Sequence, residues 1–340
     1  MKIVFFGTPQ FAVPSLQRLL AHSDFEVLAV VTQPDKRRGR GGKVTASGVK
    51  AAVKDKACPV WQPERIKKDA ETLAQLKALR ADAFVVIAYG QILSQEILAM
   101  PRLGCVNAHG SILPAYRGAA PIQWCLYHGE AETGVTTMQM DAGMDTGPML
   151  MKETISMGLL DNAWQVAEKL SQLSAALLPA TLQKLQQQMI RPVPQADERA
   201  TYAPLIKKDD YLLKWDRSAE ALHNQVRGFY PHSVTQFREQ ALKVMATVPL
   251  GEAYWSQLPA EFVDLPALYA RSLDESTDSL PPGTVVAIIK NYGPVIQTGS
   301  GHLLLSEVKP AGKKALSGWD FANGSRVEVS ESLGKLTPLN

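Results

Sequence analysis

Short apolar runs alternate with longer amphipathic stretches along the first 190 residues of the chain. The short runs are rich in β-branched residues and predict strands, whereas apolar positions that recur every three to four residues predict helices. Continuous apolar strands with helices between them are typical of a doubly wound, mostly parallel α/β sheet of the Rossmann-like type, with helices on both faces. The predicted strands cover residues 3–6, 27–31, 83–88, 104–107 and 134–140, and the predicted helices cover residues 11–21, 70–80, 120–128 and 162–187.

The pattern changes beyond residue 190. A chain of 340 residues is too long for one typical core, so we expect two domains. Residues 191–208 are rich in Pro and polar residues and predict a linker between a first domain of residues 1–190 and a second of residues 209–340. Short strand-like runs at residues 284–290 and 303–308, separated by Gly and Pro turns, predict that the second domain is a small β-barrel.

The overall composition excludes several classes of protein. The chain is 46% hydrophobic and 20% charged, and it lacks a long apolar segment, a signal peptide and a transit peptide, so we expect a cytoplasmic enzyme without a membrane span. The three cysteines, Cys58, Cys105 and Cys125, have no C-x-x-C spacing. They fit buried thiols in a reducing compartment, and they indicate neither a disulfide framework nor a zinc site.

The net charge of +3 is unevenly distributed. Residues 1–208 contain 24 Lys and Arg against 18 Asp and Glu, and the remaining residues contain 12 against 15. Part of the basic excess lies in the glycine-containing stretch of residues 36–43, which is either a solvated loop or a contact for a polyanion such as a phosphate backbone. Six acidic residues and one Arg between residues 251 and 282 account for most of the negative balance, and this stretch predicts an insertion loop.

The strongest candidate chemistry lies where the strand at residues 104–107 ends. Asn107 and His109 are two residues apart, so both point to the same face of the strand. An amide can stabilise an oxyanion and an imidazole can donate or carry a proton, which is the combination that acyl transfer uses. The alternative is an Asn that forms a turn and a partly solvated His. Ligands of doubly wound sheets bind at the carboxyl ends of strands, which favours the functional interpretation.

Two further patterns concern ligands. The turn after the first strand has one glycine, Gly7, where a dinucleotide motif needs three, and Pro9 lacks an N–H group, so the sequence argues against a nicotinamide cofactor. We expect instead a flatter, mainly apolar ligand held by glycine-flanked turns at residues 88–90 and 141–143. Asp145 is either a turn former or a carboxylate that orients His109.

Together these motifs resemble the methionyl-tRNA formyltransferase family. Ile112 is a departure, because the family commonly has Leu there, but the change conserves volume. The segments that carry the resemblance extend along the whole chain: Gly7-Thr8-Pro9 with Phe11, Gly39-Arg40-Gly41, Ala88-Tyr89-Gly90, residues 107–114, residues 117–122, residues 132–136, Asp145-Thr146-Gly147 and residues 310–314.

The resemblance implies that the formyl group of 10-formyltetrahydrofolate is transferred to the α-amino group of methionine on initiator tRNA. It also implies that the second domain is an OB-like barrel that contacts tRNA. Asn107 and His109 would bind the formyl oxygen, while Asp145 would orient His109 and help to move the proton. The implied folate-binding residues are Ser111, Ile112, Leu113, Pro114, Ala88, Tyr89, Gly90, Asp141 and Gly143, and the implied tRNA-binding residues are Arg37, Arg38, Arg40, Lys43, Lys313 and Lys314. No metal is implied, and we expect a monomer.

Two alternatives stay open. The first is another folate-dependent formyltransferase that acts on the amine of a sugar nucleotide or a purine precursor. The basic stretch and the second domain argue against it. The second is a noncatalytic RNA-binding relative, against which Asn107, His109 and Asp145 argue.

Overall fold

The computed structural model describes residues 1–38, 42–273 and 280–334. The chain forms two compact units. The first unit comprises Met1–Pro121, Thr133–Ile155 and Ala167–Pro204, and the second comprises Ile122–Glu132, Ser156–Val166 and Leu205–Asn340.

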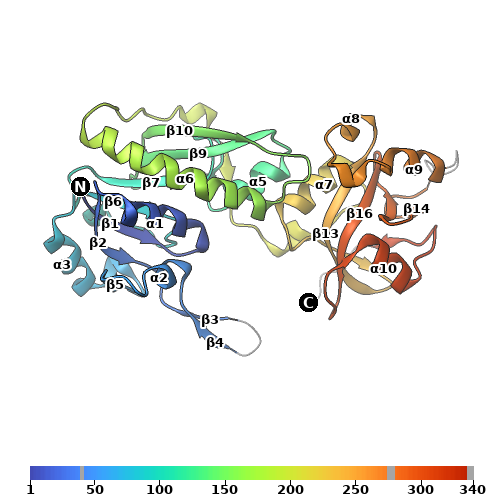
Figure 1. Ribbon diagram of the computed structural model, residues 1–340, viewed down its shortest axis with the longest axis horizontal. Coiled ribbons are helices and arrows are strands. Elements are labelled where there is room, and N and C mark those ends of the chain that lie inside the picture. Colours follow the sequence, from blue (N-terminus) through green and yellow to red (C-terminus); the bar gives the residue numbers. More distant parts are fainter. Residues whose placement is uncertain (39–41, 274–279, 335–340) are drawn as a thin grey trace. The chain divides into compact units, whose positions relative to one another are not determined.

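The first unit is built on a seven-stranded sheet with the order β10-β9-β7-β6-β1-β2-β5 (Figure 1). β1 pairs in parallel with β2 and β6, as do β6 with β7 and β2 with β5. β9 runs antiparallel to β7, so the prediction of a mostly parallel sheet is confirmed with an antiparallel pair toward one edge. The strands are β1 (Lys2–Gly7), β2 (Glu26–Val31), β5 (Val60–Trp61), β6 (Ala83–Ile87), β7 (Cys105–His109), β9 (Glu132–Gln139) and β10 (Met149–Ser156).

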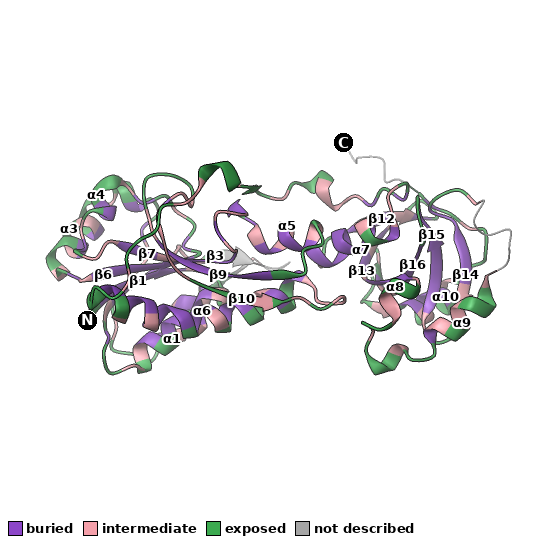
Figure 2. Ribbon diagram, turned by 90° about the horizontal axis from the view of Figure 1, so that it is seen from above, coloured by how far each residue is buried: buried purple, intermediate pink, exposed green. Residues whose placement is uncertain are grey.

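Helices cover both faces of this sheet, as Figure 2 shows for α1 and α6 on one face and α4 on the other. Alternation along β1 sends Val4 and Phe6 into a cluster with Leu76 of α3 and Ile97 of α4, and therefore sends Ile3 and Phe5 to the opposite face. All of the helices predicted for the first 190 residues are present, with ends within two residues of those expected. The helices are α1 (Val13–Ala21), α2 (Gly48–Ala52), α3 (Ala70–Leu79), α4 (Gln95–Leu98), α5 (Pro121–Tyr127) and α6 (Ala163–Gln186).

Two short ribbons accompany the sheet. β3 (Lys36–Arg38) pairs antiparallel with β4 (Lys43–Thr45), so the ends of the predicted basic loop form a hairpin. Of the predicted tRNA contacts in this hairpin, Arg40 lies outside the described residues, and Arg37, Arg38 and Lys43 are described by their backbone. β8 (Arg117–Gly118) pairs in parallel with β11 (Tyr202–Ala203).

The second unit contains a sheet with the order β14-β15-β16-β13-β12-β18, and β17 pairs with β16. Its strand pairs are antiparallel. An antiparallel bridge also joins Thr284, next to β14 at one end of this order, to Ser332, next to β18 at the other end. The strands are β12 (Val234–Phe237), β13 (Gln240–Leu250), β14 (Val285–Ile289), β15 (Gly293–Gln297), β16 (His302–Pro310), β17 (Leu316–Ser317) and β18 (Leu333–Gly334).

Both faces of this second sheet are apolar and covered. Leu305 faces a cluster that includes α7 (Ala219–Gly228) and α10 (Gly318–Ser325), whereas its neighbour Leu304 faces a second cluster that includes Leu265 of α9 (Leu265–Ser272). The predicted loop at residues 251–282 is therefore corrected: its described part forms α8 (Glu252–Trp255), a 3-10 turn at Ala260–Phe262 and α9. Because Leu265 is fully buried, this segment belongs to the core of the second unit.

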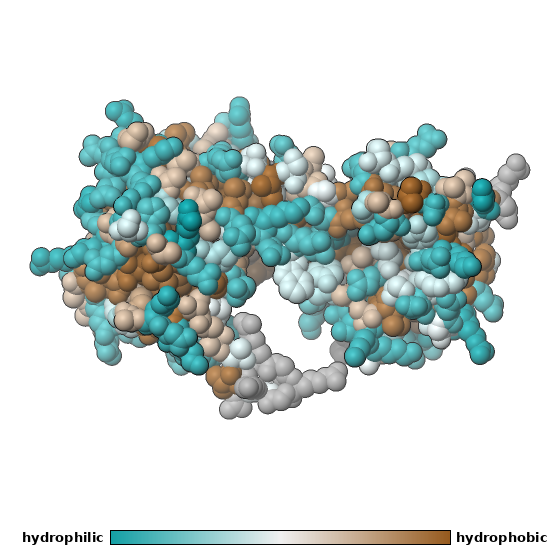
Figure 3. Space-filling view, in the orientation of Figure 1, coloured by the Kyte–Doolittle hydropathy of each residue, from teal (hydrophilic) through white to brown (hydrophobic). Residues whose placement is uncertain are grey.

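Surface and cysteines agree with a globular protein. Figure 3 shows mainly hydrophilic side chains on the visible face of both units, and small apolar patches lie among these hydrophilic side chains. Among the described residues, no helix combines the length and the apolar character that crossing a membrane requires. All three cysteines are free thiols, and burial raises the pKa of Cys105 to about 12.

Candidate active site

Three predicted catalytic side chains lie together at the carboxyl end of β7. The amide Nδ2 of Asn107 is 3.5 Å from Oδ1 of Asp145, and Nδ1 of His109 is 3.6 Å from the other carboxylate oxygen, Oδ2. Alternation along β7 places Asn107 and His109 on one face, and the chain after β9 brings Asp145 to them across 36 residues or more. The side chains of His109 and Asp145 are 7% and 17% exposed, so a bound substrate would displace little water from them.

Asp145 is held by its backbone as well as by its carboxylate. Its φ of 55° lies in the left-handed region, which is uncommon for non-glycine residues, although Asp tolerates it better than most. The backbone N–H of Gly118 donates to Oδ2 at 2.9 Å. Nε2 of Gln195 donates to the carbonyl oxygens of Asp145 and Gly147, both at 2.7 Å. The carboxylate is thus fixed from two sides before any substrate binds.

The imidazole of His109 has a defined proton arrangement. Its Nε2 lies 2.9 Å from the carbonyl oxygen of Tyr116, which can only accept a hydrogen bond. Nε2 therefore carries a hydrogen, and Nδ1 is the nitrogen that faces Asp145 and is able to gain or lose a proton.

The predicted folate stretch that follows β7 divides into inward and outward residues. Ser111 and Leu113 are buried, and the Ser111 hydroxyl donates to the carbonyl of Ala115 at 2.6 Å. Ile112 and Pro114 are half-buried and leave side chain available at the surface. Nζ of Lys152 donates to the Leu113 carbonyl, and burial lowers the pKa of this ammonium group. Ser111 and Leu113 therefore shape the loop, and Ile112 and Pro114 are the members able to touch a ligand.

The second predicted folate segment lies at the switch point of the sheet. β2 lies on one side of β1 and β6 on the other, so the loops after β1 and β6 diverge there, and such a crevice is where open α/β sheets bind ligands. The hydroxyl of Thr8, after β1, donates to the carbonyl of Tyr89 at 2.8 Å. Ala88 and Gly90 are exposed and both have positive φ, whereas the ring of Tyr89 packs edge-on against Phe6. Burial, with a contribution from Asp69, raises the pKa of the Tyr89 phenol. Tyr89 offers its backbone rather than its ring.

The remaining predicted residues have simpler surroundings. Oδ1 of Asp141 accepts from the Gly143 N–H at 3.0 Å and from the Thr146 hydroxyl at 2.7 Å, which is an Asx turn on the exposed side of the loop. Lys313 and Lys314 are exposed and belong to the second unit. Among the described residues, no three His, Cys, Asp or Glu side chains gather in a way that could hold a metal ion.

Sequence reasoning did not select the residues that hold the site. Gln195 falls in the predicted linker, 50 residues from Asp145, and no local pattern marks it. Arg117 is 2% exposed and pairs with Asp197 at 2.7 Å. Burial alone would lower the pKa of its guanidinium, but hydrogen bonds to Asp197 and Tyr202 raise it above the ordinary value. The only sign of Arg117 in the sequence was a basic residue beside Gly118 in a partly apolar stretch.

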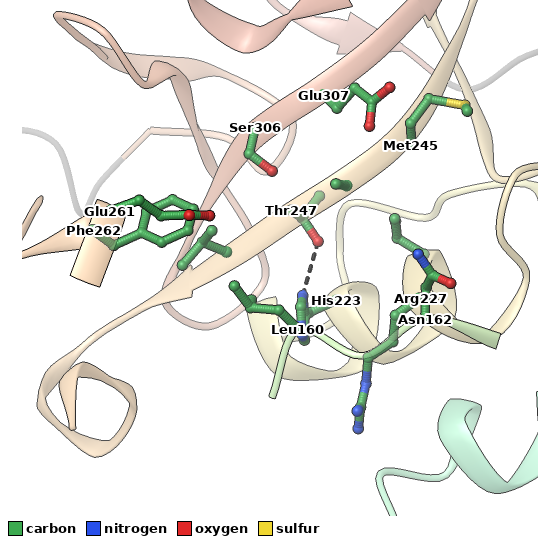
Figure 4. A pocket seen from close by; sticks show the side chains of 13 residues that line it. Leu160, Asn162, His223, Arg227, Met245, Thr247, Glu261, Phe262, Ser306 and Glu307 are labelled. Carbon is green, nitrogen blue, oxygen red and sulfur yellow. Dashed lines mark hydrogen bonds between the residues drawn. The ribbon is translucent and has the colours of Figure 1, made fainter. Parts of the chain in front are cut away.

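A cavity of about 320 Å³ lies within the second unit and contains none of the predicted residues (Figure 4). His223 lines it, and both ring nitrogens are engaged, Nδ1 with the Thr247 hydroxyl at 2.9 Å and Nε2 with the Leu159 carbonyl at 2.8 Å. Burial lowers the pKa of His223 to about 4, so the imidazole is neutral at physiological pH. Its bonds join α7 to β13 and to the segment before α6, which is a structural role.

Comparison with known proteins gives consistent matches over the whole chain. The family model described as formyl transferase matches residues 1–182, and the model described as formyl transferase, C-terminal domain, matches residues 205–326. A protein of Trichormus variabilis named methionyl-tRNA formyltransferase is 63% identical over 334 residues, which are 98% of this chain and 99% of the relative. A protein of Cyanothece sp. with the same name is 60% identical over 335 residues, with the same coverage.

Among solved structures, a sugar 3N-formyl transferase, determined in the presence of dTDP and 5-N-formyl-THF, superimposes with a TM-score of 0.63. It is 18% identical, and the match covers 92% of this chain and 99% of that one. At this level of identity the likeness concerns the fold alone.

Proposed function

The chain belongs to the methionyl-tRNA formyltransferase family, and we propose that it transfers the formyl group of 10-formyltetrahydrofolate to the α-amino group of methionyl initiator tRNA. The product is N-formylmethionyl-tRNA, which serves translation initiation. The observation that carries the proposal is the convergence of Asn107, His109 and Asp145 at a strand end, in a chain that matches relatives of this name over nearly its full length.

The reaction needs one proton to be removed and one to be delivered. The α-amino group attacks the formyl carbon, the C–N bond to methionine forms, and the amine must lose a proton as it does so. The pair of His109 and Asp145 can hold that proton, since Nδ1 of His109 and Oδ2 of Asp145 face each other 3.6 Å apart. The same proton then goes to the folate nitrogen, which leaves with the electrons of the broken C–N bond. Atoms and charges balance without a covalent enzyme intermediate.

Charge also develops on the formyl oxygen in the tetrahedral intermediate. One Nδ2 hydrogen of Asn107 is directed at Asp145, and the second is available to donate to that oxygen. The imidazole of His109 stabilises the same oxygen by its positive charge once Nδ1 carries the transferred proton, because Nε2 donates to the Tyr116 carbonyl and Nδ1 faces Asp145. Removal of one such donor from other acyl-transfer sites typically costs about 10²–10³ in kcat.

We infer that the formyl donor binds at the switch point of the sheet. The residues there fit a flat, mainly apolar ring: Ala88 and Gly90 are small and exposed, while Ile112 and Pro114 present half-buried apolar surface. In this proposal Ser111, Leu113 and Tyr89 shape the walls from behind, and the turn at Asp141 and Gly143 closes the other side.

We infer further that the second unit contacts the tRNA as an OB-like barrel. The bridge between Thr284 and Ser332 supports closure of the sheet, because it joins strands at the two ends of the strand order. Lys313 and Lys314 provide exposed positive charge beside this sheet. In the first unit, the sequence of the basic stretch at residues 36–43 carries Arg37, Arg38, Arg40 and Lys43. We also propose that the enzyme is cytoplasmic, which a tRNA substrate supports, and that it acts as a monomer.

One assay separates the proposal from its alternatives. The full-length protein is incubated with 10-formyltetrahydrofolate and methionyl initiator tRNA, and the esterified amino acid is released and analysed. We expect formylmethionine, with no requirement for an added metal. Formylation of a sugar nucleotide or purine-precursor amine in parallel reactions, with none of the methionyl-tRNA, would contradict the proposed substrate. Binding of tRNA with no formyl transfer to any amine would support a noncatalytic role instead.

A further inference from the structure

The segment between the two family-model matches is fastened to the active site by its side chains as well as by its backbone. Gln195 is the central contact, since its amide meets three partners at once. Nε2 donates to the carbonyls of Asp145 and Gly147, both at 2.7 Å, and Oε1 accepts from Nε of Arg117 at 3.0 Å. Each polar atom of the Gln195 amide therefore has a partner, and two of the three partners flank the carboxylate that the reaction uses.

Arg117 is fixed in its turn. Its guanidinium is buried and pairs with Asp197 at 2.7 Å, two residues after Gln195. The backbone N–H of Arg117 donates to the carbonyl of Thr201 at 2.9 Å. Arg117 is thus bound to Gln195, Asp197 and Thr201, which all belong to the same short segment.

The same segment fixes the two backbone groups that contact the catalytic side chains. The Thr201 hydroxyl accepts from the N–H of Tyr116 at 2.9 Å, and Tyr116 supplies the carbonyl that binds His109. Gly118, whose N–H binds Asp145, lies so close to Ala203 that a Cβ at position 118 would be 2.7 Å from the Ala203 carbonyl oxygen. Residues 195–203 therefore brace the partners of both catalytic groups.

We propose that Gln195, held by Arg117, is a positioning residue that sets the orientation of Asp145 for proton transfer. Asp145 adopts a left-handed backbone conformation, and its carbonyl is one of the two that Gln195 restrains. Without those two hydrogen bonds the loop can relax toward ordinary backbone angles, which would turn the carboxylate away from Nδ1 of His109. A displacement of about 1 Å at a reacting group can cost about 100-fold in rate. The inference rests on the proposed formyl transfer.

The test is Gln195→Glu, which keeps the shape of the side chain and the acceptor for Arg117. It replaces the donor toward Asp145 and Gly147 by an oxygen that repels both carbonyls. We expect kcat to fall about 100-fold at saturating concentrations of both substrates, with each KM within about threefold of wild type. Gln195→Met, which has similar length and no charge, should show the same loss and serves if the Glu variant does not fold.

The chain offers a matched control in the second unit. Nε2 of Gln225 also donates to two carbonyls two residues apart, those of Asp210 and Leu212, at 2.8 and 3.0 Å. Its Oε1 accepts from Nη1 of Arg217 at 3.0 Å. Gln225→Glu makes the same chemical change in the same kind of clamp, so it should lower the unfolding temperature while leaving kcat within about threefold of wild type.

A spectroscopic signal separates positioning from general damage. In protein labelled with ¹⁵N-histidine, the His109 resonances are assigned by their loss in His109→Asn, and we expect them to shift in Gln195→Glu and to stay unchanged in Gln225→Glu. A Gln195→Glu enzyme with wild-type kcat would overturn the inference, and so would one in which KM alone changes. An equal loss of kcat in Gln225→Glu would also overturn it. Absence of formylmethionine with the wild-type protein would instead reject the proposed function.

Discussion

Replacement of Asp145 by Asn tests the proton path directly, because it removes the proton acceptor and its charge while it keeps the size of the side chain. Oδ2 accepts from the Gly118 N–H at 2.9 Å, so the remaining oxygen of the Asn side chain is expected to stay at that position. The new NH2 group then faces Nδ2 of Asn107, at the place where that donor is 3.5 Å from Oδ1. Two donors cannot bond to each other, so Asn107 must turn its amide and lose the orientation that serves the formyl oxygen.

The expected loss follows from these two changes. Loss of a positioned proton acceptor costs about 10²–10⁴ in kcat, equivalent to about 3–5 kcal/mol in the barrier. Misdirection of the Asn107 donor acts in the same direction, so we expect the upper part of this range. The affinity for tRNA should be unchanged, since the side chain of Asp145 is 17% exposed and is not among the groups proposed to bind the tRNA backbone.

The assay is single-turnover formylation of methionyl-tRNA at saturating folate, with tRNA binding measured separately. Asp82→Asn is the control: its carboxylate also accepts a backbone N–H, that of Lys2 at 2.7 Å, and it pairs with Arg102. It immediately precedes β6, at the amino end of that strand, whereas the site lies at the carboxyl ends of the strands. A rate for Asp145→Asn within threefold of wild type would refute the reasoning, and so would an equal loss in Asp82→Asn.

Four further results are expected. Gly118→Ala should lower kcat at least about tenfold, because φ is 119° and the new Cβ meets the Ala203 carbonyl at 2.7 Å; a fully active variant would contradict this. Leu265→Ala should lower the free energy of unfolding by about 2–5 kcal/mol in urea titrations, and Val263→Ala, 75% exposed, by less than about 0.5 kcal/mol. Arg40→Ala should reduce the slope of log affinity for tRNA against log salt by about 0.7–0.9, with folate KM unchanged. The pKa of His223 is lowered from 6.5 to about 4, so between these pH values only the unfolded chain binds a proton at this residue. The free energy of unfolding should therefore fall by about 2 kcal/mol from pH 7 to pH 5, and this contribution should be absent in His223→Asn.

The fold of the first unit was largely predictable because its strands are buried on both faces. β1 and β6 read as continuous apolar runs of strand length between amphipathic stretches, which is typical of strands in a parallel sheet. β10 was not predicted. It begins and ends with half-buried or exposed residues and carries Lys152 and Glu153, so neither alternation nor an apolar run marks it as a strand. Its pairing partner, and not its own sequence, makes it a strand.

The helices at residues 251–282 were not predicted either, for a different reason. Its acidic composition indicated a loop, yet Leu265 is fully buried against the second sheet. Composition averages over the segment, whereas packing depends on the few apolar positions that one helical turn brings to the same side. A sheet with apolar residues on both faces needs a cover on each, and that demand could be inferred only once its strand order was known.

The residues of the candidate site also differ in how far the sequence alone reveals them. Asn107 and His109 were recognisable because a strand places residues two apart on one face, and this relation needs no knowledge of the rest of the chain. Asp145 needed the family resemblance, since a separation of 36 residues fixes no distance. Gln195 had neither. It acts through an amide that bonds to carbonyls, and every Gln in the sequence offers the same chemistry.

The distinction between the groups that react and the groups that hold them is physical. A reacting group must have a specific chemistry, so its residue type is informative. The side-chain amide of Gln195 holds the Asp145 carbonyl, and the other two holding groups are backbone: the Tyr116 carbonyl and the Gly118 N–H. Any residue has these atoms, and only the pairing of β8 with β11 and the Gln195 contacts set where they lie. The stretch expected to be a linker is therefore bonded into the frame of the site, because the atoms that orient the catalytic side chains need a second layer of backbone to hold them.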